Sequence, residues 1–177
     1  MIFTETELRG AYVIDLERRE DERGFFARTW CADEFAEHDL NTRLVQANMS
    51  WNPLKSTVRG MHFQREPHAE VKVIRVTRGA IHDVIIDLRP DSATYKRWTG
   101  VNLDAVNGRA LYVPEGFAHG FQTLVAHSEV HYLVSEFYTP SAEGGVRWDD
   151  PAFGIEWPPA DERVISEKDR SWPDFGS

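Results

Sequence analysis

Short runs of alternating apolar and polar residues fill the middle of the chain, from residue 59 to residue 138, and turn-forming residues separate them. Successive side chains of a β-strand point to opposite faces of a sheet, so this alternation predicts strands with one buried face. A three-residue link containing Gly79 joins the runs 71–76 and 80–88, which predicts a β-hairpin. Many short strands between turns are typical of a β-sandwich or a β-barrel.

Two later runs predict further strands. Residues 111–113 lead into a Pro-Glu-Gly turn, and residues 130–138 form a longer alternating run. Alternation along the longer run places Tyr132 and Tyr138 on the same face of the sheet. The two tyrosines are therefore expected to point in the same direction.

Helical periodicity is scarce in this sequence. A short helix is predicted at residues 32–38, and the segment 161–169 is predicted to end in a helical turn capped by Ser166. The Pro- and Trp-rich stretch 148–159 is expected to form an ordered arm over the barrel. The helices are thus expected to be peripheral to a β-structure.

The length and charge of the chain limit its class. With 177 residues it is long enough for one hydrophobic core, and we expect a single domain over residues 1–177. The formal net charge of −9 argues against nucleic-acid binding, which depends on dense lysine and arginine. Any anionic ligand must therefore meet a local cluster of basic residues.

Several features bear on the location of the protein. No stretch approaches the roughly 18 consecutive apolar residues that a membrane span requires, so no membrane association is expected. Residues 1–7 have neither a basic start nor a continuous apolar run, so they do not read as a secretory signal. Cys31 is the single cysteine, which favours a reducing compartment. We therefore expect a cytoplasmic protein.

Two separated segments indicate a histidine-bearing pocket. Residues 59–64 read Arg-Gly-Met-His-Phe-Gln. Residues 108–119 contain a glycine, five residues, Pro-x-Gly, two residues and His119, which is the spacing of the second half of the cupin signature. A metal-binding cupin carries His-x-His in the first half, whereas this chain has Gln64 in place of the second histidine. The change favours acid–base chemistry over metal binding.

His62 and Lys72 are candidates for that chemistry. The ordinary pKa of histidine lies near neutrality, where a general base works best, and His62 has polar neighbours whose burial without a ligand would be costly. The alternative is a structural histidine held by hydrogen bonds. Lys72 interrupts an apolar strand, and an inward-pointing ammonium would stabilise an oxyanion on a substrate carbonyl. The alternative is an edge-strand lysine whose amine reaches water.

Tyr132, Tyr138 and Asp169 are weaker candidates. Tyr132 could donate a proton opposite the base, and Tyr138 could stack on a planar ring, but aromatic residues on one strand face are more often core residues. Asp169 lies in a charged run that is exposed by default. It becomes an orienting carboxylate only if the fold brings it next to a histidine.

Metal binding is the main alternative chemistry. Candidate ligands for zinc or iron are His62, Gln64, His68, Glu70 and His119. The missing second histidine argues against such a site, because an amide is a poor substitute for imidazole. We therefore expect neither a metal nor another cofactor.

Ordered motifs along nearly the whole chain match one family. They lie at residues 21–26, 46–50, 59–64, 83–89, 114–121, 148–151 and 166–169. In these motifs the chain resembles the dTDP-4-dehydrorhamnose 3,5-epimerases, metal-free cupins of nucleotide-sugar metabolism. The resemblance implies an all-β fold, the cupin-type double-stranded β-helix or jelly roll, with short peripheral helices. It also implies inversion of C3 and C5 in a nucleotide-linked 4-keto-6-deoxyhexose.

The resemblance gives the candidate residues specific roles. It implies that His62 removes each α-proton with Asp169 as its partner, that Lys72 stabilises the enolate oxygen at C4, and that Tyr132 returns a proton from the opposite face. Tyr138 falls on the position that stacks against the nucleotide base. The other implied substrate-binding positions are Arg23, Phe26, Arg28, Gln46, Asn48, Arg59, His119, Glu143 and Lys168.

The resemblance further implies a homodimer, in which N-terminal residues such as Arg23 and Phe26 reach the pocket of the partner. Three positions depart from the family pattern. Arg28 stands where an acidic residue is expected, Glu70 replaces an expected glutamine, and Leu133 replaces an expected lysine. These changes alter the charge around the ligand and leave the nucleotide and the exact hexose open.

Other functions therefore remain to be distinguished. A C3-only epimerase, or an epimerase of another nucleotide-linked 4-keto sugar, would share nearly all these motifs. A 3,4-ketoisomerase would keep the pocket and move the carbonyl. A metal-dependent cupin and a sugar-nucleotide-binding module without catalysis are the more distant alternatives.

Overall fold

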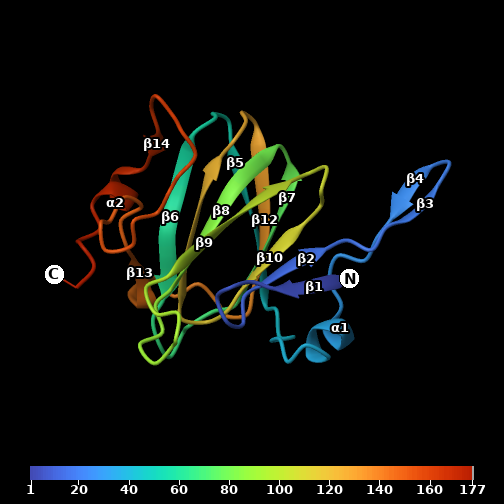
Figure 1. The fold of residues 1–177 in the computed structure, drawn as a ribbon, viewed down its shortest axis with the longest axis horizontal. Coiled ribbons are helices and arrows are strands. Elements are labelled where there is room, and N and C mark those ends of the chain that lie inside the picture. Colours follow the sequence, from blue (N-terminus) through green and yellow to red (C-terminus); the bar gives the residue numbers. More distant parts are fainter. Residues whose placement is uncertain (177) are drawn as a thin grey trace.

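The computed structural model describes residues 1–176 and consists mainly of two β-sheets packed face to face (Figure 1). In spatial order, sheet I contains β1 (Ile2–Glu5), β2 (Tyr12–Asp15), β10 (Ala110–Val113), β7 (Lys72–Arg78), β12 (Ser128–Val134) and β5 (Gln46–Asn52). Sheet II contains β13 (Glu143–Gly145), β6 (Thr57–Gln64), β11 (Phe117–Thr123), β8 (Ala80–Asp87) and β9 (Trp98–Asp104). The strand β14 (Val164–Ile165) adds to β6 in parallel.

The hydrophobic core lies between the two sheets. Its buried residues include Ile74, Val76, Leu111, Ile81, Ile85 and Phe121. Along β7, Ile74 and Val76 face this core, whereas Val73 packs with Phe35 and Tyr112 on the other face of sheet I. The alternation read from the sequence is therefore confirmed for this strand, and it places Lys72 on the same side as Ile74.

The predicted hairpin between residues 71–76 and 80–88 is wrong. Both strands exist, but β7 pairs with β10 and β12 in sheet I, whereas β8 pairs with β11 and β9 in sheet II. The link crosses from one sheet to the other at Gly79, whose φ is +77°. A Cβ atom there would lie 2.5 Å from the Ser128 Oγ, so only glycine fits this crossing.

The predicted strand 130–138 is wrong after Val134. β12 ends there, and side chains from distant parts of the sequence accept hydrogen bonds from the backbone N–H groups that follow. The N–H of Tyr138 donates to the side-chain oxygen of Gln46 at 3.0 Å, and the N–H of Thr139 donates to that of Gln64 at 2.6 Å. Tyr138 therefore lies in a loop and does not share a strand face with Tyr132.

The helices are short and peripheral. The predicted helix at 32–38 is present as α1 (Ala32–Ala36), followed by a turn. The predicted terminal turn is present as α2 (Glu167–Arg170), and the Ser166 Oγ accepts a hydrogen bond from the Asp169 N–H at 3.1 Å. A single 3₁₀ turn, η1 (Pro140–Ala142), precedes β13. Among the described residues, no helix has both the length and the apolar character needed to cross a membrane.

The arm expected at residues 148–159 packs on the outer face of sheet II. Phe153, Ile155 and Trp157 contact a cluster that includes Met61 and Ala118. The Trp157 indole N–H donates to the carbonyl of Trp148 at 2.7 Å. The arm therefore covers an apolar sheet face that would otherwise be exposed.

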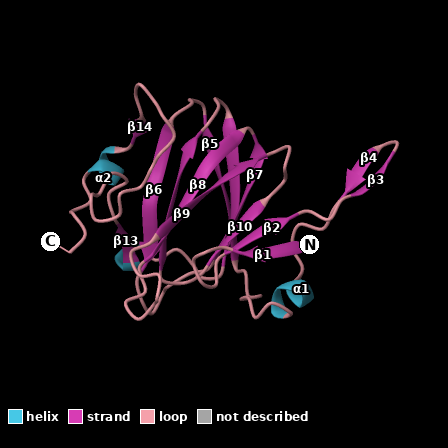
Figure 2. Cartoon of the chain, viewed as in Figure 1, coloured by secondary structure: helices cyan, strands magenta, loops and turns pink. Residues whose placement is uncertain are grey.

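An N-terminal hairpin projects away from the two sheets. It consists of β3 (Arg19–Asp21) and β4 (Gly24–Phe26), which pair only with each other (Figure 2). Phe25 and Phe26 are exposed on it, the latter by 70%. Large exposed aromatic side chains on a projecting hairpin indicate an interaction surface.

Candidate active site

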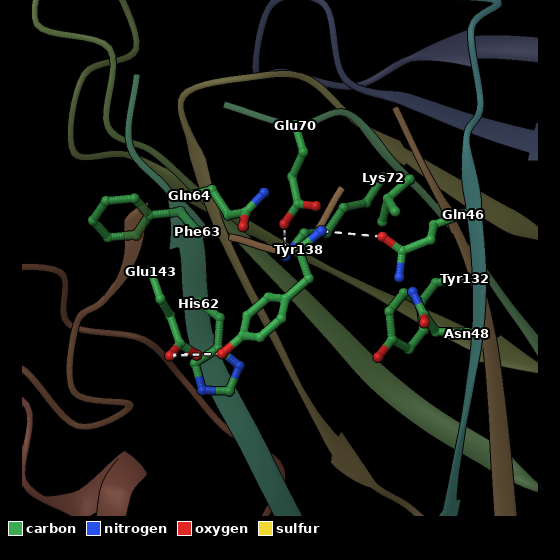
Figure 3. A pocket seen from close by; sticks show the side chains of 11 residues that line it. Gln46, Asn48, His62, Phe63, Gln64, Glu70, Lys72, Tyr132, Tyr138 and Glu143 are labelled. Atoms are coloured by element: carbon green, nitrogen blue, oxygen red, sulfur yellow. Dashed lines mark hydrogen bonds and ion pairs between the residues drawn. The ribbon is translucent and has the colours of Figure 1, made fainter. Parts of the chain in front are cut away.

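A pocket opens between the two sheets and is lined by residues of both (Figure 3). It has two neighbouring cavities, of about 310 Å³ and 200 Å³, which share His62, Lys72 and Tyr132. The larger cavity is also lined by Gln46, Asn48, Phe63, Gln64, Glu70, Val134, Tyr138 and Glu143. The smaller cavity is also lined by Ser50, Arg59, His119 and Phe121. The pocket therefore gathers residues from distant parts of the sequence.

A close backbone approach brings two histidines side by side. His62 on β6 and His119 on β11 are register partners, and the register shifts just after His119. A Cβ atom on Gly60 would lie 2.5 Å from the Gly120 Cα, and Gly60 has a φ of +129°. Glycine at both positions therefore lets the two strands touch and places both imidazoles at the same level of the pocket.

His62 is paired with the carboxylate of Asp169. The His62 Nε2 lies 2.7 Å from the Asp169 Oδ1, and the Gly60 N–H donates to the Asp169 Oδ2 at 3.2 Å. The Asp169 side chain is only 5% exposed, whereas that of His62 is 33% exposed. The carboxylate thus holds one ring nitrogen and leaves the other available to a ligand.

The environment of Asp169 favours its charged form. Burial alone would raise the pKa of its carboxyl, but the hydrogen bonds from His62 and the Gly60 N–H outweigh burial and lower it below the ordinary value. Asp169 is therefore ionised at neutral pH. An ionised partner fixes the orientation of the imidazole.

Asp169→Asn is expected to flatten the response of stability to acid. A carboxyl with a depressed folded-state pKa stabilises the protein above its unfolded pKa, and this stabilisation is lost as the pH falls through the folded pKa. The free energy of unfolding of the wild type should therefore drop more steeply below about pH 4 than that of the variant. Urea unfolding from pH 3 to pH 7 tests this, and parallel curves would contradict it.

His119 has its own buried carboxylate. Its Nε2 lies 2.7 Å from the Asp83 Oδ1, and Asp83 is fully buried, with its second oxygen unpaired in the described structure. The neighbouring Arg59 is held by the Asn52 side-chain oxygen, to which its Nε donates at 2.7 Å. Asp83 and Asn52 therefore orient His119 and Arg59, two of the residues that line the smaller cavity.

Lys72 points into the pocket. β7 is a central strand between β10 and β12, so the alternative of an edge-strand lysine reaching water is wrong. The Lys72 side chain is 12% exposed, and its ammonium lies 3.1 Å from the Glu70 Oε1. A largely buried cation beside a cavity is placed to stabilise negative charge on a ligand.

Tyr132 faces His62 from the other sheet. It lies on β12, packs against the core and lines both cavities. Burial raises the pKa of its phenol, the charge of Arg59 opposes this, and the charge of Glu70 adds to it. The phenol is therefore protonated at neutral pH and can donate a proton.

Tyr138, Glu143 and Lys168 meet at the mouth of the pocket. The Tyr138 hydroxyl donates to the Glu143 Oε2 at 3.2 Å, and the Lys168 ammonium contacts both Glu143 oxygens at 2.6 Å. The hydrogen bond from Lys168 lowers the pKa of Glu143 against the effect of burial. Tyr138 is itself exposed, so its ring face is open to a ligand.

Three predicted binding residues are not near the pocket of their own chain. Arg23 is paired with Asp21 on the projecting hairpin, Phe26 is exposed at the base of this hairpin, and Arg28 is paired with Glu34 at 2.6 Å. None of the three lines either cavity.

Four of the five candidate metal ligands, His62, Gln64, Glu70 and His119, line the two cavities, but they do not form a ligand group. The Gln64 side-chain amide donates to the carbonyls of His68 and Phe137 and accepts from the Thr139 N–H. Within residues 1–176, no three His, Cys, Asp or Glu side chains are grouped so that they could hold a metal ion. The alternative of a metal-dependent cupin therefore has no support in the geometry.

Sequence reasoning missed several functional positions. Asp83 had a usable signal, because a carboxylate inside the apolar run 81–86 requires a buried partner. Asn52, Ser50 and Phe121 had none, since polar and aromatic residues are ordinary at such strand positions. Their place in the site follows only from which strands become neighbours.

Comparison with known proteins identifies the family. The family model described as dTDP-4-dehydrorhamnose 3,5-epimerase matches residues 5–177. The enzyme of that name from Methanothermobacter thermautotrophicus is 46% identical over 172 residues, which cover 96% of this chain and 92% of that protein. A dTDP-4-dehydrorhamnose 3-epimerase from Streptomyces niveus is 41% identical over 152 residues, covering 85% and 73%.

Similarity extends to the three-dimensional structure. The crystal structure of the 3,5-epimerase from Bacillus anthracis, with TDP and PPi bound, has a TM-score of 0.94 and 41% identity. The match covers 98% of this chain and 99% of that chain. The expected all-β jelly roll is thereby confirmed. The chain belongs to the dTDP-4-dehydrorhamnose 3,5-epimerase family.

Proposed function

We propose that the protein is an isomerase of dTDP-rhamnose biosynthesis that converts dTDP-4-dehydro-6-deoxyglucose to dTDP-4-dehydrorhamnose by inverting C3 and C5. The observation that carries this proposal is the arrangement of an imidazole and a phenol on opposite sheets of one pocket. His62, backed by Asp169, lies on β6, and Tyr132 lies on β12. Inversion needs a base and an acid on opposite faces of a carbon.

Each inversion takes place through an enolate. His62 removes the α-proton, the C–H electron pair forms a C=C bond, and the carbonyl pair moves to the C4 oxygen. Lys72 stabilises that oxygen with an N–H donor in a partly closed pocket. Tyr132 then donates its proton to the opposite face and restores the ketone. Each inversion leaves His62 protonated and Tyr132 deprotonated, and proton exchange with solvent resets both groups before the next one. Because only protons move, no oxidant or reductant is needed.

The nucleotide part binds towards the mouth of the pocket. Tyr138 presents an exposed ring for stacking on the base, held by its contacts with Glu143 and Gln46. The guanidinium groups of Arg23 and Arg59 suit the pyrophosphate, because their forked donors match phosphate oxygens. The B. anthracis relative with bound TDP and PPi supports a nucleotide ligand of this class.

We further propose a homodimer in which the N-terminal hairpin completes the pocket of the partner. β5 is the edge of sheet I, and Met49 and Trp51 are exposed along it. The hairpin carries the exposed Phe26 together with Arg23. A second copy seated on this edge would cover the apolar side chains and bring Arg23 to a pocket that lacks it.

Mixing two defective variants tests this exchange. Arg23→Ala should raise KM for the nucleotide sugar, and His62→Ala should be inactive. In a heterodimer of the two, one pocket receives an intact Arg23 from the His62→Ala subunit. Co-expression should therefore restore normal KM in about a quarter of all pockets. If Arg23 acted in its own chain, no pocket would be restored and the exchange would be disproved.

We propose the reducing cytoplasm as the location of the protein, and its single cysteine, the half-buried Cys31, is compatible with this.

C3-only inversion is the second candidate activity, because the S. niveus relative is named a 3-epimerase. Residues shared by both activities do not distinguish them. The distinction must come from the product.

Deuterium incorporation tests the proposed function. The purified protein is incubated with dTDP-4-keto-6-deoxyglucose in D₂O, and C3 and C5 are followed by NMR. Incorporation at both carbons, with an L-sugar after chemical reduction, is the expected result. Incorporation at C3 alone would favour the 3-epimerase, and ligand binding without exchange would favour a binding module. A chelator in the buffer should leave deuterium exchange unchanged, whereas loss of exchange would indicate a metal-dependent reaction.

A further inference from the structure

We propose that Glu70 is a positioning residue whose side-chain oxygen fixes the ammonium group of Lys72 in the pocket. The proposal rests on the proposed function. The Glu70 and Lys72 side chains are 11% and 12% exposed, and the Glu70 Oε1 lies 3.1 Å from the Lys72 Nζ. Both residues line the larger cavity, where Figure 3 shows the carboxylate next to the ammonium.

The backbone that carries Glu70 is held on both sides. The carbonyl of His68 accepts a hydrogen bond from the Gln64 amide at 3.0 Å. The N–H of Val71 donates to the Ser135 Oγ at 2.8 Å, and the carbonyl of Val71 accepts from the Ser135 N–H at 3.1 Å. Glu70 therefore extends from a fixed segment, and its carboxylate is a stable anchor.

Lys72 needs such an anchor. Lysine places a point charge at the end of a flexible four-carbon stem, and an oxyanion-stabilising donor must be oriented before the reaction. An ammonium has three N–H donors, so contact with Glu70 leaves two for the enolate oxygen. Two nearly buried charges are also costly unless they are paired. The contact with Glu70 therefore directs the ammonium group.

The two contributions of Glu70, its hydrogen-bond acceptor and its charge, can be separated. Glu70→Gln keeps an acceptor oxygen and removes the charge, whereas Glu70→Leu removes both at similar volume. If Glu70 positions Lys72, kcat should fall less than threefold in Glu70→Gln and about 10- to 100-fold in Glu70→Leu, with KM changed less than threefold in both. Equal losses in the two variants, or a loss confined to KM, would overturn the proposal.

A double-mutant cycle with Lys72→Met shows whether Glu70 acts through the lysine. Adding Glu70→Leu to Lys72→Met should lower kcat by less than threefold more, because the group to be positioned is already absent. Additive losses would show an independent, structural role. Circular dichroism and thermal melting verify folding, and the comparison of Glu70→Gln with Glu70→Leu decides the question if Lys72→Met does not fold.

Asp15→Asn is the matched control. It removes the carboxylate of an ion pair with Arg109 at 2.8 Å, and Asp15 lies outside the pocket. This variant should keep kcat and KM. Deuterium exchange by the wild type separates the failure of this proposal from the failure of the proposed function. If the wild type exchanges at both carbons and the double-mutant cycle is additive, only the role of Glu70 is overturned. If the wild type shows no exchange, the proposed function is overturned, and the role of Glu70 with it.

Discussion

Replacing His62 with asparagine should nearly abolish turnover, with kcat lowered about 10³-fold and KM changed less than threefold. Proton transfer by a well-placed base contributes about 10²- to 10⁴-fold, and asparagine cannot accept a proton at neutral pH. Its amide can still contact Asp169, so the fold should be kept. Steady-state kinetics of the coupled reaction measures the loss.

Deuterium exchange makes this test more specific. If His62 serves both carbons, His62→Asn should lose exchange at C3 and at C5 together. Loss at one carbon with retention at the other would show a second base, and His119 would be the nearest candidate because it pairs with His62 across β6 and β11. Full activity in the variant would contradict the assignment of His62 altogether.

Two further measurements separate chemistry from folding. His62→Ala leaves space beside Asp169, and added imidazole should restore part of the activity if only the base is missing. His38→Asn is the matched control, because His38 is exposed and its ring contacts that of Phe3 at a centroid distance of 4.2 Å, away from both cavities. This control should retain wild-type kcat.

The sequence alone predicts which residues are buried better than which strands become partners. Alternation along residues 71–76 and 80–88 correctly assigns two strands, since the pattern reports the face that each side chain takes. It does not report pairing, and the expected hairpin is in fact a crossing between sheets at Gly79. Pairing depends on packing between sheets, which a local pattern does not contain.

The end of β12 shows the same limit. The sequence of residues 130–138 does not indicate that the strand ends at Val134. The end depends on the side chains of Gln46 and Gln64, which accept hydrogen bonds from backbone N–H groups after this strand. Those residues lie 92 and 75 positions from the groups that they bind. The prediction that Tyr138 lies on this strand is therefore wrong, although Tyr138 does line the pocket.

The candidate site was predictable mainly through the family resemblance. Spacing could single out His62 and Lys72 as polar residues in apolar strands, but the contact between His62 and Asp169 joins positions 107 apart. Only the fold brings α2 next to β6. The hairpin residues such as Arg23 do not line the pocket of their own chain, so their predicted binding role depends on the family resemblance alone.

Replacing Tyr132 with phenylalanine should separate proton removal from inversion. The variant lacks only the hydroxyl, and its ring can still pack against the core. His62 should continue to form the enolate, and its side chain is 33% exposed, so its proton can exchange with solvent. Deuterium uptake should therefore fall less than tenfold, while formation of the inverted product should fall about 10²-fold.

The product depends on which face of the enolate receives the returning proton. Without the phenol, the enolate is reprotonated by the imidazole on its original face, which regenerates labelled substrate. Tyr112→Phe is the matched control, because the Tyr112 hydroxyl lies outside the pocket and accepts a hydrogen bond from the Asn41 N–H at 3.1 Å. This variant should lose about 1 kcal/mol of stability and form the same product as the wild type. If uptake and inversion fell equally in Tyr132→Phe, the phenol would act in enolisation, and if the product were unchanged, the opposite-face donor would be another group.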